Sequence, residues 1–305
     1  MKAAIDIGTN TVLLLIAELE NGIIKPIHEE HRVPRLGKGV DADKNINEAA
    51  TQRVISALKD FKDIITSDFP KVDTVTVTAT SAVRDAKNRQ EFIQKIKNET
   101  GFTIQLLSGK EEAEWTAAGA LSVLEVTEEE TLILDIGGGS TEVAQVKEDS
   151  VLDAHSYDMG SVRFTERFLH EDPPTGKQIL TCKKEIKHLF DSRPFSTNSK
   201  VHAVGVAGTV TTLAGMVLDL KEYHPEKLNG HALTVNDIQS VISEFSSTAS
   251  NKMLEKHPVY LKGRADIFLA GMLILEGFMT QYGLEKLIVS IGGIRHGAVI
   301  NSRSL

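Results

Sequence analysis

The sequence predicts an α/β protein with two mixed-sheet domains, one a duplicate of the other. An apolar strand runs into a glycine- and hydroxyl-rich loop led by aspartate at two places, residues 6–11 (DIGTNT) and 135–141 (DIGGGST). A β meander follows each loop, and helical and β segments then alternate. One copy of this pattern in each half of the chain indicates a duplication.

Strands and helices are expected in the same order in both halves. In the first half we expect strands at 12–19, 23–33 and 74–78, a hairpin turn at Asn21-Gly22, and helices at 48–61, 87–97 and 111–123. In the second half we expect strands at 142–146, 151–157, 201–206 and 287–290, and helices at 176–190, 235–245, 264–282 and from 294. Each half therefore opens with a three-stranded meander.

The length of the chain agrees with two domains. Chains of 305 residues with 41% hydrophobic residues usually divide their core. We place domains at 1–120 and 121–305, near the charged segment 128–130 (EEE), and expect the helix near 294–305 to pack back on the first domain. Because no Pro- or Ser-rich linker is present, the two domains are expected to face each other across a ligand-binding cleft.

Composition limits the partners and the compartment. A net charge of -8 argues against nucleic-acid binding, so an anionic substrate needs a local cluster of donors and cations. The single Cys182 excludes an intramolecular disulfide and suits a reducing compartment. No secretory signal is visible, and the apolar segment 267–278 is too short for a bilayer. We therefore expect a cytoplasmic protein with no membrane or nucleic-acid partner.

Both aspartate-led loops have the composition of an anion site. Successive backbone N–H groups in such loops point in one direction and bind anions. Glycines remove the Cβ atoms that would keep a phosphate away, and the hydroxyl and amide side chains add donors. A lone loop of this kind could equally be a tight turn, but two copies favour binding. The candidate phosphate-binding residues are Gly8, Thr9, Asn10, Thr11, Gly137, Gly138, Gly139, Ser140 and Thr141.

Three carboxylates are candidate metal ligands. Asp6 and Asp135 end apolar strands, where an unpaired buried carboxylate is costly. Carboxylate oxygens beside a bound phosphate suit Mg²⁺, which takes one or two protein carboxylates and keeps waters. Glu142, seven residues after Asp135, can reach the same space, although a solvent-facing strand residue is the alternative.

A cation and a carboxylate lie between the two loops in sequence. Ser81 and Arg84 follow a strand, and an Arg guanidinium matches two phosphate oxygens at once. Ser108 and Glu111 form a capping box that starts a helix. The next residue, Glu112, is a candidate general base. The alternative is an ordinary acidic residue in the first turn of a helix, where the helix dipole stabilises a negative charge.

Two further glycine turns occur late in the chain. Residues 207–209 (AGT) and 292–297 (GGIRHG) follow strands and offer free N–H groups at helix starts, which adds Gly208, Thr209 and Arg295 as candidate binding residues. Each turn is a weak signal alone. The histidines show no zinc spacing, and His296 beside Arg295 is the one of interest. No P-loop or dinucleotide-binding fingerprint is present.

Taken together, these motifs resemble the exopolyphosphatase and guanosine pentaphosphatase family in order and spacing. The resemblance covers nearly the whole chain, in a short two-domain form. The matching segments are 6–11 (DIGTNT), 80–84 (TSAVR), 108–113 (SGKEEA), 135–142 (DIGGGSTE), 160–163 (GSVR), 207–209 (AGT) and 292–297 (GGIRHG).

The resemblance implies a duplicated ribonuclease-H-like fold of the actin-like ATPase superfamily, with the reaction in the interdomain cleft. It implies that Glu112 is the general base and that Asp135 and Glu142 hold Mg²⁺ directly or through water. Arg84 and the backbone of residues 137–140 would bind the phosphoryl group. It further implies a basic approach to the site at Arg32 and Arg35, and a homodimer.

We therefore expect a phosphohydrolase that releases terminal orthophosphate from inorganic polyphosphate or guanosine pentaphosphate. Water would attack in line while Glu112 deprotonates it, and Arg84 with Mg²⁺ or another divalent cation would stabilise the developing charge. Both substrates stay open because each presents a terminal phosphoanhydride. The alternatives are an actin-like ATP-dependent kinase and a non-catalytic polyphosphate or alarmone sensor.

Overall fold

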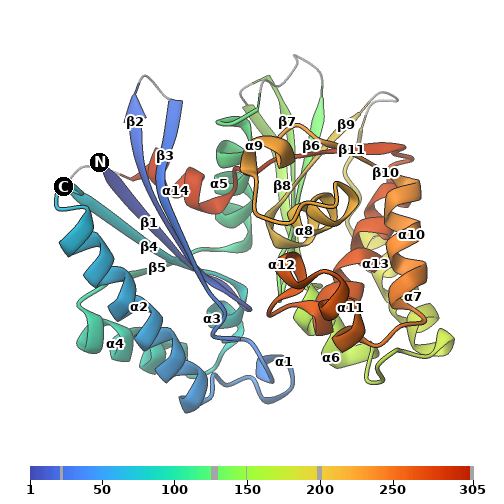
Figure 1. Cartoon of the computed structure of the whole chain (residues 1–305), viewed down its shortest axis with the longest axis horizontal. Helices are drawn as coiled ribbons and strands as arrows, with labels where there is room; N and C mark the ends of the chain where they lie inside the picture. The colour runs from blue at the N-terminus through green and yellow to red at the C-terminus, as the bar shows by residue number, and fades with distance from the viewer. Residues whose placement is uncertain (21–22, 125–129, 149, 198–200, 303–305) are drawn as a thin grey trace. The chain divides into compact units, whose positions relative to one another are not determined.

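The chain forms two compact units in a computed structural model that describes residues 1–20, 23–124, 130–148, 150–197 and 201–302 (Figure 1). Unit 1 comprises Met1–Val123 and Gly292–Leu305, and unit 2 comprises Leu124–Ile291. The predicted break at 120/121 lies slightly before this division, and the last helix, placed by number in the second domain, belongs to unit 1. The predicted turn at Asn21-Gly22 and the charged residues Glu128 and Glu129 lie outside the described residues.

The sheet of unit 1 has the predicted meander at its start. In the described residues its strand order is β3-β2-β1-β4-β5, with antiparallel pairing among the first three strands and parallel pairing from β1 to β4 and β5. The strands are β1 (Lys2–Ile7), β2 (Val12–Glu20), β3 (Ile23–Arg32), β4 (Thr74–Ala79) and β5 (Ile104–Leu106). The helices are α1 (Val40–Asp43), α2 (Glu48–Asp68), α3 (Ser81–Asp85), α4 (Arg89–Thr100), α5 (Gly109–Leu121) and α14 (Ile294–Asn301).

Unit 2 repeats this order. Its sheet reads β8-β7-β6-β9-β11-β10 in the described residues, so β6 to β9 and β11 match β1 to β5, and β10 is an added edge strand. The predicted α/β fold of two mixed-sheet units, one a duplicate of the other, is confirmed. The strands are β6 (Thr131–Ile136), β7 (Thr141–Lys147), β8 (Ser150–Tyr157), β9 (His202–Val206), β10 (Ala232–Thr234) and β11 (Lys286–Val289).

Most of the predicted helices of unit 2 are confirmed, and the short ones are additions to the prediction. Helices α7 (Gly176–Ser192), α10 (Val235–Phe245) and α13 (Ala265–Gln281) lie where the apolar periodicity placed them. The added helices are α6 (Ser161–Phe168), α8 (Ala207–Val217), α9 (Pro225–Leu228), α11 (Ser250–Lys256) and α12 (Pro258–Leu261). Helix α8 begins at the turn of residues 207–209, where the sequence indicates a helix start but not its length. The other four helices are too short to give a periodic signal.

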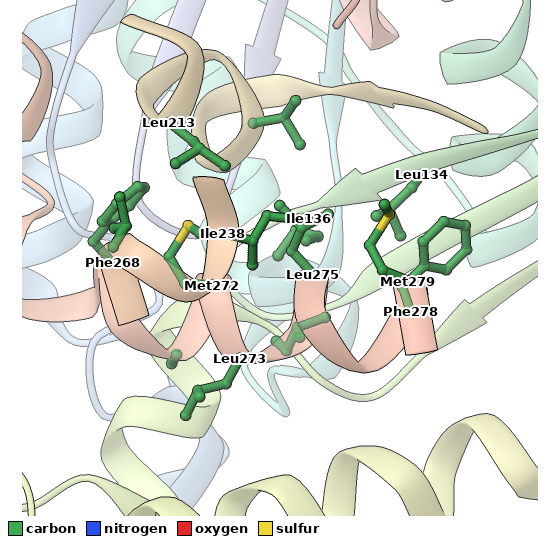
Figure 2. Packing of buried hydrophobic residues seen from close by; sticks show 14 of the residues in the cluster. Leu134, Ile136, Leu213, Ile238, Phe268, Met272, Leu273, Leu275, Phe278 and Met279 are labelled. Carbon is green, nitrogen blue, oxygen red and sulfur yellow. The ribbon is translucent and has the colours of Figure 1, made fainter. Parts of the chain in front are cut away.

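Helix α13 is the centre of the unit 2 core (Figure 2). Its apolar side chains are buried on nearly all sides, which explains why the segment reads as continuously apolar rather than amphipathic. Among the described residues, no helix is long and apolar enough to cross a membrane. The side chains of α13 and its neighbours in the core include Leu134, Ile136, Leu213, Ile238, Phe268, Met272, Leu275, Phe278 and Met279.

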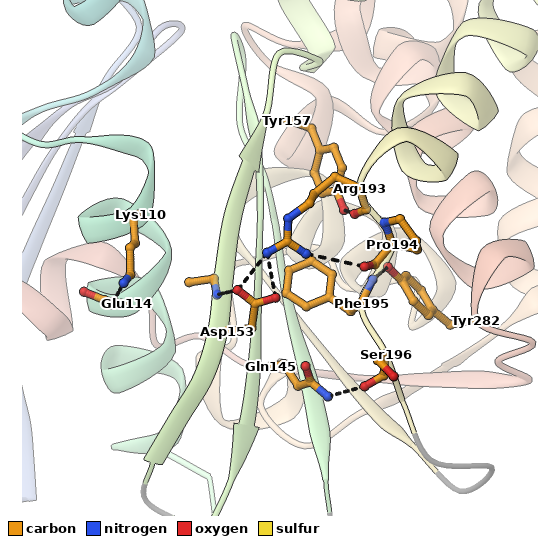
Figure 3. A network of polar contacts seen from close by, with 11 residues as sticks. Lys110, Glu114, Gln145, Asp153, Tyr157, Arg193, Pro194, Phe195, Ser196 and Tyr282 are labelled. Atoms are coloured by element: carbon orange, nitrogen blue, oxygen red, sulfur yellow. Dashed lines mark hydrogen bonds and ion pairs between the residues drawn. The ribbon is translucent and has the colours of Figure 1, made fainter.

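A polar network fixes the segment after α7 against the sheet of unit 2 (Figure 3). The Arg193 guanidinium donates to both carboxylate oxygens of Asp153 on β8, at 2.9 and 2.8 Å. The Gln145 amide of β7 donates to the Ser196 carbonyl at 2.7 Å, and the Phe195 N–H donates to the Tyr282 hydroxyl at 3.2 Å. These bonds anchor residues 193–196 to two strands and to the end of α13.

Helix α14 returns to unit 1 and packs on α5, β1 and β2. Glycines permit the close approach of the two helices. A Cβ added to Gly119 would lie 2.0 Å from the Gly293 carbonyl oxygen, and one added to Gly297 would lie 2.0 Å from the Trp115 carbonyl oxygen. The glycines of the segment 292–297 (GGIRHG) therefore allow α14 to pack closely on α5.

We predict that Gly119→Ala destabilises the protein by about 1 to 3 kcal/mol, the usual cost of overpacking. Without a clash, alanine would stabilise a helix relative to glycine, so a decrease in the free energy of unfolding identifies the clash. The matched control is Gly176→Ala in α7, where an added Cβ meets nothing within 4 Å. Chemical denaturation measures both variants, and equal stability for Gly119→Ala and wild type would contradict the close packing.

His296 of α14 predicts a loss of stability in acid. Its side chain is buried, neither ring nitrogen has a hydrogen-bond partner within the described residues, and burial with the charge of Arg295 lowers its pKa to about 3. The unfolded chain therefore binds more protons than the folded one between about pH 6.5 and 3. The free energy of unfolding should fall by up to about 5 kcal/mol as pH decreases through this range.

Denaturation of His296→Leu at several pH values measures this effect. The stability of the variant relative to wild type should rise as pH falls from 7 to 4, because the variant has no buried imidazole to protonate. His188→Leu, which replaces an exposed histidine of α7, is the control. A wild-type-like pH dependence in His296→Leu would contradict the prediction.

Candidate active site

The loop after β6 comprises residues 137–140, and its carbonyl groups accept hydrogen bonds from helix α6. The first turn of α6 donates to it: Ser161 N–H to the Gly137 carbonyl at 2.9 Å, and Val162 N–H to the Gly138 carbonyl at 2.8 Å. Gly160 precedes this turn, and a Cβ there would lie 2.5 Å from the Gly138 carbonyl oxygen. Glycine at position 160 is thus required for α6 to reach the loop.

This arrangement directs the N–H groups of the loop to the other side. In a trans peptide the C=O of one residue and the N–H of the next point in opposite directions. The N–H groups of Gly138, Gly139 and Ser140 therefore point away from α6, and none of them donates a hydrogen bond to another described residue. Gly139 and Ser140 are buried, where backbone N–H groups nearly always have an acceptor. These three N–H groups are therefore candidate donors to an anion.

The loop after β1 repeats this geometry in unit 1. Gly37 N–H donates to the Thr9 carbonyl at 2.7 Å, and Arg35 N–H donates to the Asn10 carbonyl at 3.0 Å. The N–H groups of Asn10 and Thr11 consequently point away from residues 35–37. A Cβ on Gly37 would lie 2.1 Å from the Thr9 side chain, so a glycine again permits the approach.

The first peptide of each loop closes in the same way. Gly8 N–H donates to the Thr11 carbonyl at 2.9 Å, and Gly137 N–H donates to the Ser140 carbonyl at 3.0 Å. The Thr141 hydroxyl donates to the Met159 carbonyl at 2.7 Å, which is a structural bond at the edge of the loop.

Asp135 and Glu142 form a carboxylate pair in unit 2. They are direct cross-strand neighbours on β6 and β7, so their side chains lie on the same face of the sheet. The Ser156 hydroxyl, opposite Glu142 on β8, donates to Glu142 Oε1 at 2.6 Å. No group of three or more metal-binding side chains occurs within the described part of the chain. The pair still fits Mg²⁺, which commonly takes only one or two protein carboxylates.

Asp6 has different surroundings. Its cross-strand neighbour on β2 is Leu13, where unit 2 has Glu142. The Thr78 hydroxyl of β4 donates to Asp6 Oδ1 at 3.1 Å. Burial raises the pKa of Asp6 to about 6, against the opposing effects of the Thr78 hydrogen bond and the charge of Arg295. Unit 1 therefore lacks the second carboxylate at the matching position.

Glu112 and Arg84 lie together in unit 1. The capping box predicted at Ser108 and Glu111 is present and starts α5, so Glu112 is in the first turn. Arg84 is in the last turn of α3, and its Nη1 donates to Glu112 Oε2 at 2.8 Å and to the Leu107 carbonyl at 3.2 Å. Glu112 is 7% exposed, so the bond orients a nearly buried carboxylate. Ser81, also buried, opens α3.

The turn that begins α8 lies beside the unit 2 loop. Asp135 pairs with Val206 of β9, and the Thr209 hydroxyl donates to the Ile136 carbonyl at 3.3 Å. Ala207 has a φ of 61°, a strained value for a residue with a Cβ, and such residues cluster at functional sites. The structure thus brings Gly208 and Thr209 to the loop of residues 137–140.

Arg264 is a candidate binding residue that the sequence reasoning missed. A Cβ on Gly208 would lie 2.0 Å from Arg264 Nη1, so the guanidinium occupies the space beside this turn. Burial lowers its pKa, and within the described residues its hydrogen bond goes to the neutral Thr212 hydroxyl, at 3.3 Å. In the sequence Arg264 is only the first residue of the predicted helix 264–282, and no residue pattern links it to Gly208.

The remaining predicted cations have structural contacts. Arg32 contacts Glu30 and Asp60 and lies over the Phe61 ring. Arg295 donates to the Leu14 carbonyl at 3.0 Å and pairs with Glu29 at 2.9 Å. Arg35 has a φ of 52° in the segment that backs the first loop. Among the residues that the structure describes, neither Arg32 nor Arg295 forms a hydrogen bond with another predicted site residue.

Comparison with known proteins identifies the family of the chain. The sequence profile described as the Ppx/GppA phosphatase family matches residues 15–304. The chain is 31% identical to exopolyphosphatase 2 of Mycobacterium tuberculosis over 98% of this chain and 97% of that protein. A Ppx/GppA family member from Aquifex aeolicus is 30% identical and superimposes with a TM-score of 0.82, covering 98% of this chain and 95% of the other.

A solved exopolyphosphatase-like protein is also 30% identical, with a TM-score of 0.92 over 98% of this chain and 96% of the other. The match therefore includes the fold of both units. The loop of residues 137–140, the carboxylate pair and the Arg84–Glu112 pair fall within the residues that the family profile matches, whereas the loop of residues 8–11 precedes them. On these grounds the chain belongs to the Ppx/GppA phosphatase family.

Proposed function

We propose that the protein releases terminal orthophosphate from inorganic polyphosphate, guanosine pentaphosphate or both, with Mg²⁺ or another divalent cation as cofactor. The observation that carries this proposal is the set of three N–H groups of residues 138–140, directed to one side beside the Asp135 and Glu142 carboxylates. Donors in this arrangement suit a phosphoryl group with a bound cation.

The unit 1 residues supply what a hydrolysis needs. We propose that Glu112 accepts a proton from water as the water oxygen bonds to the terminal phosphorus. The bond from that phosphorus to the bridging oxygen breaks, and the shortened phosphate chain leaves with that oxygen. Arg84, bonded to Glu112, orients it and stabilises charge on the transferring oxygens. This assignment requires groups of both units to act on the same phosphoryl group.

Asp135 and Glu142 are the residues proposed to hold the divalent cation, with Asp6 as a further candidate. When bound, the cation would offset charge on the phosphate oxygens. The Ser156 hydroxyl donates a hydrogen bond to one oxygen of Glu142 and so orients this carboxylate. Metal-binding carboxylates commonly have such hydrogen-bond partners.

The substrate class follows from the relatives and from the chemistry of the site. The M. tuberculosis relative is named an exopolyphosphatase, and the matching family is described as the Ppx/GppA phosphatase family. A terminal phosphoanhydride is the group that both substrates share. The donors described contact a phosphoryl group and carry no preference for a nucleoside.

Orthophosphate release with Mg²⁺ tests the proposed function. We would assay short polyphosphate, long polyphosphate, guanosine pentaphosphate and ATP in parallel, with wild type, Glu112→Gln and the control Glu114→Gln on the same helix. We expect release from at least one of the first three, a loss of roughly 100-fold or more in kcat for Glu112→Gln, and little change for Glu114→Gln. Turnover of ATP alone, or no release at all, would contradict the proposal.

The cation dependence of the same assay tests the carboxylate pair. Glu142→Gln should raise the Mg²⁺ concentration that gives half-maximal activity by about 10-fold or more, because a ligand is lost. Ser156→Ala should raise it less than Glu142→Gln does, because it removes a hydrogen bond behind the carboxylate and leaves the carboxylate in place. Ser150→Ala, on the same strand as Ser156, is the control. An unchanged Mg²⁺ dependence in Glu142→Gln would remove that residue from the cation site.

A further inference from the structure

Arg163 is a buried cation that touches the loop of residues 137–140 from behind. It is the third residue of α6 and is 6% exposed. Its Nε donates to the Gly139 carbonyl at 2.5 Å, and its own backbone N–H donates to the Gly138 carbonyl at 3.0 Å. Burying a guanidinium is costly unless it is well bonded. The side chain is therefore used to hold the loop.

Each carbonyl of the loop has its own donor. The Gly137 carbonyl is held by Ser161, the Gly138 carbonyl by the backbone of Val162 and Arg163, and the Gly139 carbonyl by the Arg163 side chain. By the peptide geometry above, these bonds orient the N–H groups of Gly138, Gly139 and Ser140 respectively. The direction of the Ser140 N–H thus depends on one side chain, whereas the other two depend on backbone.

The duplicated loop in unit 1 performs the same task differently. Asn10 is the counterpart of Gly139, four residues after the leading aspartate. Its carbonyl accepts a hydrogen bond from the backbone N–H of Arg35 at 3.0 Å. In unit 2 the chain instead places a planar guanidinium, whose Nε–H has a fixed direction, against the matching carbonyl.

We propose that Arg163 is a positioning residue for the phosphohydrolase reaction. Its Nε–H fixes the Gly139–Ser140 peptide so that the Ser140 N–H is directed at an oxygen of the bound phosphoryl group. The inference rests on the proposed function for its effect on the reaction. Its structural part, the dependence of a single N–H on Arg163, is measurable with inorganic phosphate alone.

The test combines NMR with kinetics on the full chain. Backbone amide signals of Gly138, Gly139 and Ser140 would be followed as inorganic phosphate is added in the presence of Mg²⁺, for wild type, Arg163→Met, Arg163→Lys and the control Arg167→Met. Arg167 is an exposed arginine on the same helix. In wild type and Arg167→Met, all three amides should shift. In Arg163→Met the response of Ser140 should be lost while Gly138 and Gly139 still respond.

The kinetic arm uses tripolyphosphate. We expect Arg163→Met to lower kcat by about 10- to 100-fold, below or near the loss seen when one transition-state donor is removed, with KM changed less than about threefold. Arg163→Lys keeps the charge without the fixed Nε–H, so it should recover at most part of kcat. If Arg163→Met does not fold, Arg163→Lys carries both measurements, with a weakened Ser140 response expected.

Two results would overturn the proposal. The first is a Ser140 response in Arg163→Met that equals that of wild type. The second is loss of all three amide responses together, which would make Arg163 a general support of the fold. If wild type hydrolyses no phosphate substrate but shows the three shifts, with only Ser140 lost in Arg163→Met, the proposed function fails while the positioning by Arg163 stands.

Discussion

The site depends on the constraint that a trans peptide imposes on its two polar groups. Fixing a carbonyl from behind fixes the direction of the next N–H in front. In unit 2, α6 and Arg163 hold three successive carbonyls, and in unit 1 the backbone of Arg35 and Gly37 holds two. Gly37 and Gly160 let these segments approach closely enough. The donors are thus oriented before any ligand binds, which removes an ordering cost from binding.

The two copies of the fold have diverged at matched positions. The leading aspartates have the same loop after them, but the seventh residue is Leu13 in unit 1 and Glu142 in unit 2. Unit 2 therefore has a carboxylate pair beside its loop, while unit 1 has the Arg84–Glu112 pair on α3 and α5. A duplicated scaffold that places a loop in each unit has in this way acquired different chemical groups in each.

The sequence predicted most of the strands, the longer helices and the loops because these have local signals, whereas the short strands β5 and β10 were not predicted. Asp6 and Asp135 follow apolar strands, and the Ser108 capping box identifies the start of α5. Arg163 and Arg264 were not predicted as site residues. Each acts through a contact set by the tertiary fold, with a loop carbonyl more than 20 residues away in one case and with the turn at Gly208 in the other. Neither distance in sequence has a characteristic residue pattern.

The charge of the protein bears on how such a site holds a polyanion. The chain carries a net charge of -8, and several of the arginines described above are engaged with protein groups: Arg84 with Glu112, Arg163 with Gly139, Arg295 with Glu29. Oriented N–H groups carry only partial charges. The Asp135–Glu142 pair adds negative charge beside them. Binding a terminal phosphate there would therefore require a divalent cation to balance the local charge, so we expect substrate and cation to bind cooperatively.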